Sequence, residues 1–171
     1  MPSDVHILGL SLHAFTQFHV VLSLIGILAG LVVVLGMLGS NLLNAVTVLF
    51  LATTVLTSLT GFLFPFKGVT PGIVIGILSL IMLLAAILAR YAFHFSGAWR
   101  WIYVVSSIVA LWFNVFIFIV QSFEKIPALH ALAPTQTETP FKIAQLIVLL
   151  TFIVLGVRAV KKFHSNPIPA A

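Results

Sequence analysis

The chain has 171 residues, of which 61% are hydrophobic and 6% are charged, and its net charge is +5. A soluble domain carries about 25% charged residues, so this chain could not cover its surface with polar groups in water. Its eight Lys and Arg residues are scattered along the sequence, which argues against a nucleic-acid partner. The absence of cysteine excludes disulfides, thiolate catalysis and cysteine-ligated zinc or iron–sulfur centres.

Five apolar stretches are each long enough to cross about 30 Å of hydrocarbon as a helix. They cover about residues 14–38, 42–64, 72–93, 99–122 and 140–162. The first stretch lacks the basic start of a signal peptide, so we expect it to be retained. The sequence therefore predicts an all-α integral membrane bundle of about five transmembrane helices. We expect a single domain, residues 1–171, with one longer outer loop at about 123–139. A four-span alternative would leave one stretch lying in the membrane interface.

Several residues near the expected helix starts are typical of capping positions. Thr70-Pro71 and Thr139-Pro140 each place a hydroxyl before a proline at the first helical position. Ser40-Asn41 and Ser96 are the candidate caps of the second and fourth spans. Because the connection at Gly39 to Asn41 is so short, the first two spans must form an antiparallel hairpin.

The charged residues predict the orientation of the spans. With five spans, one side of the membrane receives five cations, which are Arg90, Arg100, Arg158, Lys161 and Lys162. The other side receives three cations, Lys67, Lys125 and Lys142, together with all the acidic residues. The positive-inside rule then places the N-terminus outside and the C-terminus inside. The short loops and the absence of Asn-x-Ser/Thr sequons suit a bacterial inner membrane.

Two glycine pairs predict close helix packing. Gly26 and Gly30 in the first span, and Gly72 and Gly76 in the third, are four residues apart, a spacing that lets two backbones approach. The pattern does not say whether this packing occurs within one chain, in a homo-oligomer or in a larger membrane complex.

The sequence lacks the groups that several common membrane mechanisms require. No Asp or Glu lies inside a predicted span, although ion-coupled carriers usually keep an ionisable group there. No phosphate-binding glycine loop, H-E-x-x-H or G-x-S-x-G motif occurs. We therefore expect a non-enzymatic protein, and no catalytic residue is assigned.

Six histidines raise the question of haem or metal binding. His19 lies near the outer end of the first span and His94 at the inner end of the third. At 1.5 Å per residue the two are more than about 20 Å apart in depth, so they cannot share one iron. His94 with His164, or His19 with His13 or His130, remain open as pairs. A metal site built from Asp4, His6, His13 and His130 is a further hypothesis.

Polar residues of four spans are predicted to share the outer half of the membrane. In the first span Thr16, His19, Ser23, Gly26 and Gly30 follow one another at helical spacing. The candidate ligand-binding residues are His19, Ser23, Ser58, Asn114, Gln121 and Gln145. They either hold the helices together, at about 0.6–2 kcal/mol per hydrogen bond, or line a site for a lipophilic molecule.

Two functions follow from these observations. The first is a non-enzymatic accessory or structural membrane subunit whose partners are the lipid bilayer and other membrane proteins. The second is a binder or carrier of a quinone-like or haem-like molecule in the outer pocket. The segment Pro127 to Pro134 is predicted to form one or two amphipathic helical turns over that pocket. No motif in the sequence identifies a cofactor.

Overall fold

The computed structural model, which describes residues 5–65, 68 and 70–165, contains five long apolar helices. These helices are α1 (Leu12–Leu38), α2 (Asn44–Gly61), α3 (Pro71–Ile87), α4 (Trp99–Lys125) and α6 (Thr139–Ser165). A π-helical turn, η1 (Leu88–Ala92), continues α3, and a short helix, α5 (Pro127–Leu132), joins α4 to α6. Two-residue strands, β1 (His6–Ile7) and β2 (Leu10–Ser11), form an antiparallel hairpin before α1. The prediction of an all-α bundle with five membrane-spanning helices is confirmed.

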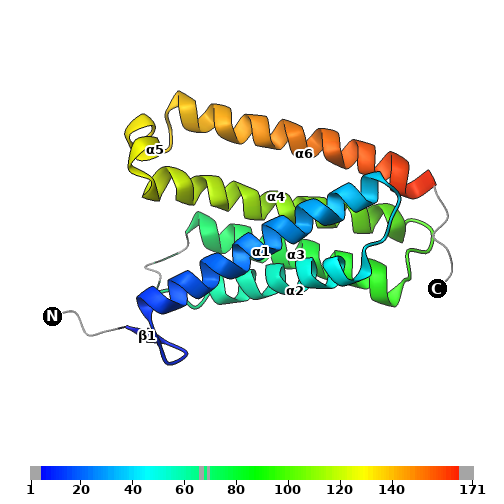
Figure 1. The fold of residues 1–171 in the computed structure, drawn as a ribbon, viewed down its shortest axis with the longest axis horizontal. Coiled ribbons are helices and arrows are strands. Elements are labelled where there is room, and N and C mark those ends of the chain that lie inside the picture. The colour runs from blue at the N-terminus through cyan, green and yellow to red at the C-terminus, as the bar shows by residue number, and fades with distance from the viewer. Residues whose placement is uncertain (1–4, 66–67, 69, 166–171) are drawn as a thin grey trace.

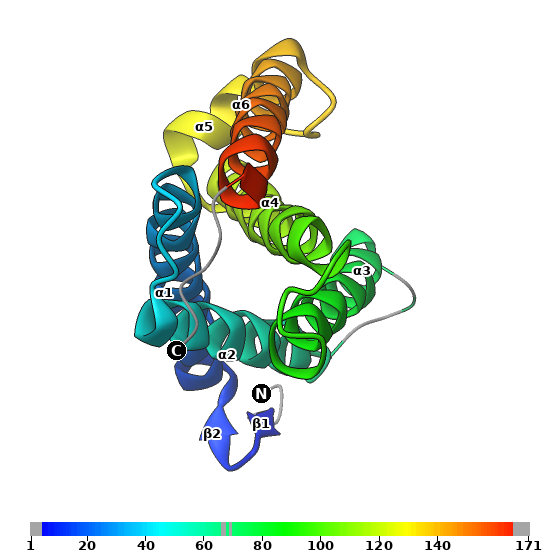
Figure 2. The same ribbon diagram turned by 90° about the vertical axis from the view of Figure 1, so that its right-hand side faces the viewer.

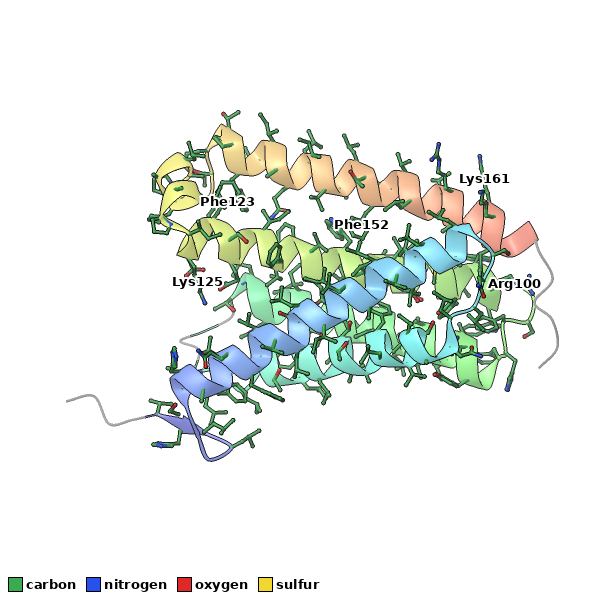
Figure 3. The ribbon with its side chains drawn as sticks, in the orientation of Figure 1. Arg100, Phe123, Lys125, Phe152 and Lys161 are labelled. Carbon is green, nitrogen blue, oxygen red and sulfur yellow. The ribbon has the colours of Figure 1, made fainter. Side chains whose placement is uncertain are left out.

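The first four long helices form a ring, in which α1 contacts α2, α2 contacts α3, α3 contacts α4 and α4 contacts α1 (Figure 2). Helix α6 lies outside this ring, against α4 and α1. Successive long helices run in opposite directions, so α1 begins at the end that carries α5 and α6 ends at the opposite end (Figure 1). We call these the α5 end and the Arg100 end. Lys125 lies at the first, and Arg100 and Lys161 lie at the second (Figure 3).

Helix starts agree with the capping predictions at one position and differ at three. Thr70 caps α3, because its Oγ1 accepts a hydrogen bond from the Ile73 amide at 3.4 Å. Helix α6 begins at Thr139 itself, and the carbonyl of Glu138 accepts its first backbone bond, so the predicted cap was one residue late. The Ser40 and Ser96 predictions were wrong, since α2 and α4 follow Leu43 and Ala98 without a side-chain cap.

Backbone turns take the place of those two missing caps. Ser40 has φ of 56° and, with Asn41, donates backbone bonds to the last turn of α1. Ser40 therefore ends α1 and does not start α2. At Ser96 the backbone carbonyl, and not the hydroxyl, accepts a bond from the Trp99 amide at 3.0 Å.

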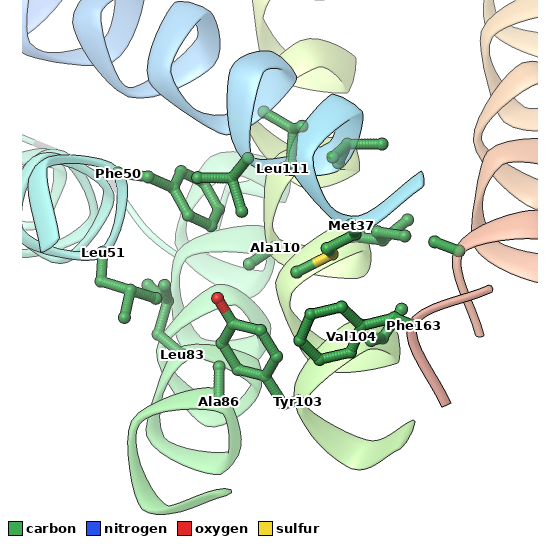
Figure 4. Packing of buried hydrophobic residues seen from close by; sticks show 14 of the residues in the cluster. Met37, Phe50, Leu51, Leu83, Ala86, Tyr103, Val104, Ala110, Leu111 and Phe163 are labelled. Carbon is green, nitrogen blue, oxygen red and sulfur yellow. The ribbon is translucent and has the colours of Figure 1, made fainter. Parts of the chain in front are cut away.

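The hydrophobic core fills the Arg100 half of the ring. Met37, Phe50, Leu83, Tyr103 and Leu111, from four different helices, are at most 1% exposed (Figure 4). Phe163 of α6 joins them from outside the ring. The tight packing stops near the middle of the bundle, and in the α5 half the ring surrounds a cavity.

Three of the four predicted glycines are sites of close packing within the chain. A Cβ at Gly30 would lie 2.6 Å from Leu111 Cδ1, and one at Gly76 would lie 2.9 Å from Phe62 Cζ. At Gly26 it would lie 3.2 Å from the Thr53 and Thr54 hydroxyls. Gly72 differs, because its nearest such neighbour is the capping hydroxyl of its own helix at 3.7 Å.

The predicted loop at 123–139 is largely ordered by contacts with α4. Helix α4 continues to Lys125, and α5 provides the expected helical turn. Ala133 is fully buried, and the Gln136 side-chain amide donates to the Val120 carbonyl at 3.0 Å. The segment therefore lies against the end of the bundle.

Candidate functional site

A cavity of about 640 Å³ lies inside the ring at the α5 end, between α1, α2, α3 and α4. We call it the α1–α4 cavity. Its walls are mainly apolar, with polar side chains from each of the four helices. Five of the six predicted site residues line it: His19, Ser23, Ser58, Asn114 and Gln121. Its volume falls in the range of about 300–1,000 Å³ that is typical of small-molecule sites.

The polar stripe of α1 faces the ring as its spacing predicted. Thr16, His19 and Ser23 line the cavity, while Gly26 and Gly30 follow on the same face toward the core. Because these glycines lack side chains, α2 and α4 approach α1 closely and close the cavity on the side of the hydrophobic core. The α1 sequence thus places polar groups in the cavity and close packing between the cavity and the core.

His19 lies in the cavity wall, and its hydrogen bond determines which ring nitrogen remains without a partner. Its Nδ1 lies 2.8 Å from Thr60 Oγ1. The Thr60 hydroxyl already donates to the Leu56 carbonyl at 2.7 Å, so its oxygen accepts a hydrogen bond from the Nδ1–H group. Neutral His19 therefore carries its hydrogen on Nδ1, and Nε2 is left as an acceptor without a protein partner among the described residues. The Phe64 ring packs edge-on against the imidazole, with 5.2 Å between centroids.

Pairs of polar side chains join neighbouring helices around the cavity. The Asn114 amide donates to Thr54 Oγ1 at 3.4 Å, which links α4 to α2. Ser58 donates to Ser79 Oγ at 3.3 Å, which links α2 to α3. The Thr57 hydroxyl, also in the wall, is buried without a hydrogen-bond partner. These groups both hold the ring together and line its interior.

The cavity wall includes three polar residues that the sequence reasoning missed, Ser79, Ser122 and Lys125. Ser79 follows Gly76 by three residues on α3, so a stripe of small residues was a usable signal for it. Lys125 follows Gln121 by four residues on α4 and lies at the α5 end. Gln121 itself is exposed, and its amide donates to Glu124 Oε2 at 3.2 Å. The mouth of the cavity thus carries one lysine.

Gln145, the sixth predicted site residue, does not line the α1–α4 cavity. It lies on α6, outside the ring, and its side-chain amide donates to the Phe116 carbonyl of α4 at 3.2 Å. Its depth was predicted from the span, but the side of α4 on which α6 packs was not readable from the sequence. The hydrogen bond joins two helices, as the interhelical alternative predicts for this residue.

The histidines do not gather into a metal centre in the described part of the chain. No group of three or more His, Cys, Asp or Glu side chains is placed to hold a metal ion there. His19 is the one histidine among the described residues of the cavity wall. Asp4 and the His164 side chain, which entered two of the sequence hypotheses, lie outside what the structure describes.

Comparisons with protein-family models, curated proteins and solved structures found no match to this chain. The geometry of the site is therefore the basis for inferring the function.

Proposed function

We propose that this chain is a non-enzymatic membrane protein that binds a lipophilic ring compound bearing a hydroxyl group, of the quinol class, in the α1–α4 cavity. The observation that carries the proposal is the cavity of about 640 Å³ with His19 fixed in its wall by Thr60. An apolar body fits walls that are mainly apolar, and a polar head needs a small number of oriented partners.

The tautomer of His19 favours the reduced, hydroxylated form of such a ligand. An acceptor nitrogen binds a hydroxyl hydrogen, whereas a quinone carbonyl oxygen needs a donor in that place. Lys125 at the mouth can donate to a second oxygen of the head group. A haem held by two histidines is less well supported, because His19 is the one histidine in the described wall.

The first experiment is to find what the protein retains and to measure binding of a defined probe. Mass spectrometry of an organic extract of the protein, purified in mild detergent, should detect a lipophilic compound at near one per chain. Decylubiquinol and decylubiquinone are then titrated against the purified protein, and we expect the reduced form to bind more tightly. A colourless extract with only bulk lipid, together with no binding of either probe, would reject the proposal.

A matched pair of histidine variants separates binding from folding. His19→Leu should weaken decylubiquinol binding about tenfold, the equivalent of one hydrogen bond of about 1.4 kcal/mol. His13→Leu is the control, because His13 is exposed on the same helix and does not line the cavity. Equal binding by both variants would show that the imidazole does not contact the ligand.

Thr60→Val tests the tautomer argument separately. The substitution keeps the side-chain shape and removes the oxygen that accepts from Nδ1. His19 is then free to carry its hydrogen on either nitrogen, so the preference for the reduced probe should decrease while some binding of both forms remains. An unchanged preference would contradict the role assigned to Nε2.

A second candidate function is an accessory subunit of a larger membrane complex, which the position of α6 favours. Only 11% of the residues in the most apolar stretch of α6 are buried, whereas the corresponding share is 39–44% in α1, α2 and α4. A photoreactive phenylalanine analogue at the exposed Ile147 tests this idea in native membranes. A near-stoichiometric adduct with one protein would support a complex, and adducts with lipid alone would argue against it.

A further inference from the structure

Arg90 is a buried cation at the Arg100 end, on the opposite half of the molecule from the cavity. It lies in the π-helical turn η1 and is 8% exposed. Its Nη2 donates to Asn44 Oδ1 at 2.8 Å, while Nε and Nη1 are buried without a hydrogen-bond partner. The guanidinium carbon lies 5.2 Å from the centre of the Tyr91 ring and 6.0 Å from that of Phe95.

The part of the chain that the structure describes offers Arg90 no carboxylate. Its two acidic residues, Glu124 and Glu138, lie at the α5 end, next to the ends of α4 and α6. A buried charge is costly unless it is paired and hydrogen-bonded, and here its polar neighbours are neutral: the Asn44 amide and the Tyr103 hydroxyl. π-Helical turns such as η1 are rare and occur frequently at functional sites. These features together favour a further, anionic partner for Arg90, beyond the groups that the described residues supply.

The first turn of α2 adds to the positive character beside Arg90. Helix α2 starts after Leu43 with no side-chain cap, so its free amide groups and the positive end of its dipole lie next to Asn44. Asn44 itself is exposed, although it binds the buried guanidinium. An approaching anion can therefore replace the Asn44 carbonyl as the acceptor of Nη2.

An apolar groove of about 440 Å³ runs along the outer surface of the bundle to the same place. It lies between α2 and the end of α3, and we call it the α2–α3 groove. Its lining residues are Val48, Leu51, Ala52, Val55, Leu56, Ile87 and Tyr91. From Val48 to Leu56 it follows α2 for about 12 Å, at 1.5 Å per residue. Tyr91, at one end, is the ring that packs against Arg90.

We propose that Arg90 and the α2–α3 groove form a binding site for an anionic phospholipid. One acyl chain lies in the groove, and the phosphate group accepts hydrogen bonds from the Arg90 guanidinium and the first turn of α2. A guanidinium binds a phosphate more strongly than a neutral amide, because both partners are charged and two parallel bonds can form. The site shares no lining residue with the α1–α4 cavity, so it can be tested independently of the proposed function.

Native mass spectrometry tests the head-group part of the proposal. The full chain is released from nanodiscs that contain equal amounts of phosphatidylglycerol and phosphatidylcholine, and the retained lipids are counted. The wild-type protein should retain phosphatidylglycerol preferentially, at about one per chain. Arg90→Gln should reduce the retained fraction at least tenfold, whereas Arg158→Gln, which removes an exposed arginine from α6, should leave it within about twofold. Equal losses in the two variants would overturn the specific site.

A groove variant keeps the test decisive if Arg90→Gln fails to fold. Ala52→Phe fills the α2–α3 groove without changing any charge, and Val157→Phe adds the same ring to an exposed position of α6. Retention of phosphatidylglycerol should fall at least fivefold in the first variant and stay unchanged in the second. Unchanged retention in Ala52→Phe would overturn the acyl-chain assignment.

Inorganic phosphate distinguishes a lipid site from a simple anion site. We expect phosphatidylglycerol at micromolar concentration to raise the melting temperature of the detergent-solubilised wild-type protein, and phosphate at the same concentration to leave it unchanged. If phosphate and lipid stabilise the protein equally, and Ala52→Phe responds to both as the wild type does, the lipid proposal is wrong.

Discussion

At the scale of single residues, Gly30 sets how closely three helices approach one another. The position lies in α1, and a side chain there would meet Leu111 of α4 and Phe50 of α2. Glycine inside a helix costs about 1 kcal/mol relative to alanine. The two large side chains that occupy the space over Gly30 are at most 1% exposed, and their burial offsets that cost.

Gly30→Ala should therefore destabilise the protein. The new Cβ would lie 2.6 Å from Leu111 Cδ1 and 2.9 Å from Phe50 Cδ2, so the core must shift, at about 1–3 kcal/mol. The measurement is the thermal unfolding midpoint in detergent. Gly156→Ala in α6 is the control, because its Cβ would meet nothing closer than 3.8 Å and should be tolerated. A midpoint for Gly30→Ala at or above that of the control would contradict the packing argument.

At the scale of elements, the segment between α5 and α6 is organised around one carboxylate. Glu138 Oε1 accepts from the Thr135 hydroxyl at 2.7 Å and from its amide at 3.2 Å, and Oε2 accepts from the Thr137 amide at 3.0 Å. The hydrogen bond from the Thr135 side chain, together with those from the backbone amides, lowers the pKa of Glu138 below its ordinary value of 4.5. The ionised form is thus the one that orders this turn.

The order of this turn should depend on pH in a defined direction. Because the folded pKa is lowered, the contribution is fully present above pH 4.5 and is lost as the pH falls through the folded pKa. The Thr135 and Thr137 amide resonances of ¹⁵N-threonine-labelled protein should shift toward random-coil positions in acid. Glu138→Gln should weaken the turn at neutral pH. Glu124→Gln is the control, because among the described residues the Glu124 carboxylate accepts a hydrogen bond from the exposed Gln121 amide alone.

At the scale of the whole molecule, five antiparallel spans place the two kinds of loop at opposite ends. The η1–α4 connection around Ser96 lies at the Arg100 end, and α5 lies at the other. The orientation with the N-terminus outside is a prediction from the distribution of positive charge.

The absence of native cysteine permits a direct test of this topology. Ser96→Cys and Ala131→Cys introduce single thiols at exposed positions of the two ends. A membrane-impermeant maleimide applied to intact cells should label Ala131→Cys alone, and both variants should react after permeabilisation. Labelling of Ser96→Cys alone would reverse the orientation. Labelling of both on intact cells would contradict five spans.

The sequence by itself determined the class of the fold, the five spans and much of the cavity wall. Apolar length decides which segments cross the bilayer, because unpaired backbone groups cannot remain in hydrocarbon. Helical spacing then decides which residues share a face, and this was enough to group His19 and Ser23 on α1. Position along each span follows from the same count, and Ser58 and Asn114 lie with His19 in the cavity wall.

Only the tertiary structure decided which helix faces meet. Gln145 has a suitable depth but lies on a helix that packs outside the ring, a consequence of contacts far apart in the sequence. The hydrogen bond from the Thr60 hydroxyl to the Leu56 carbonyl lies within α2 and follows from helical geometry. The contact between Thr60 and His19 forms only because α1 packs against α2 at these two residues. The buried state of Arg90 likewise depends on α2, η1 and α4 meeting at one end. Spacing along one helix is local and can be read from the sequence, whereas the choice of neighbouring helices depends on the packing of the whole bundle.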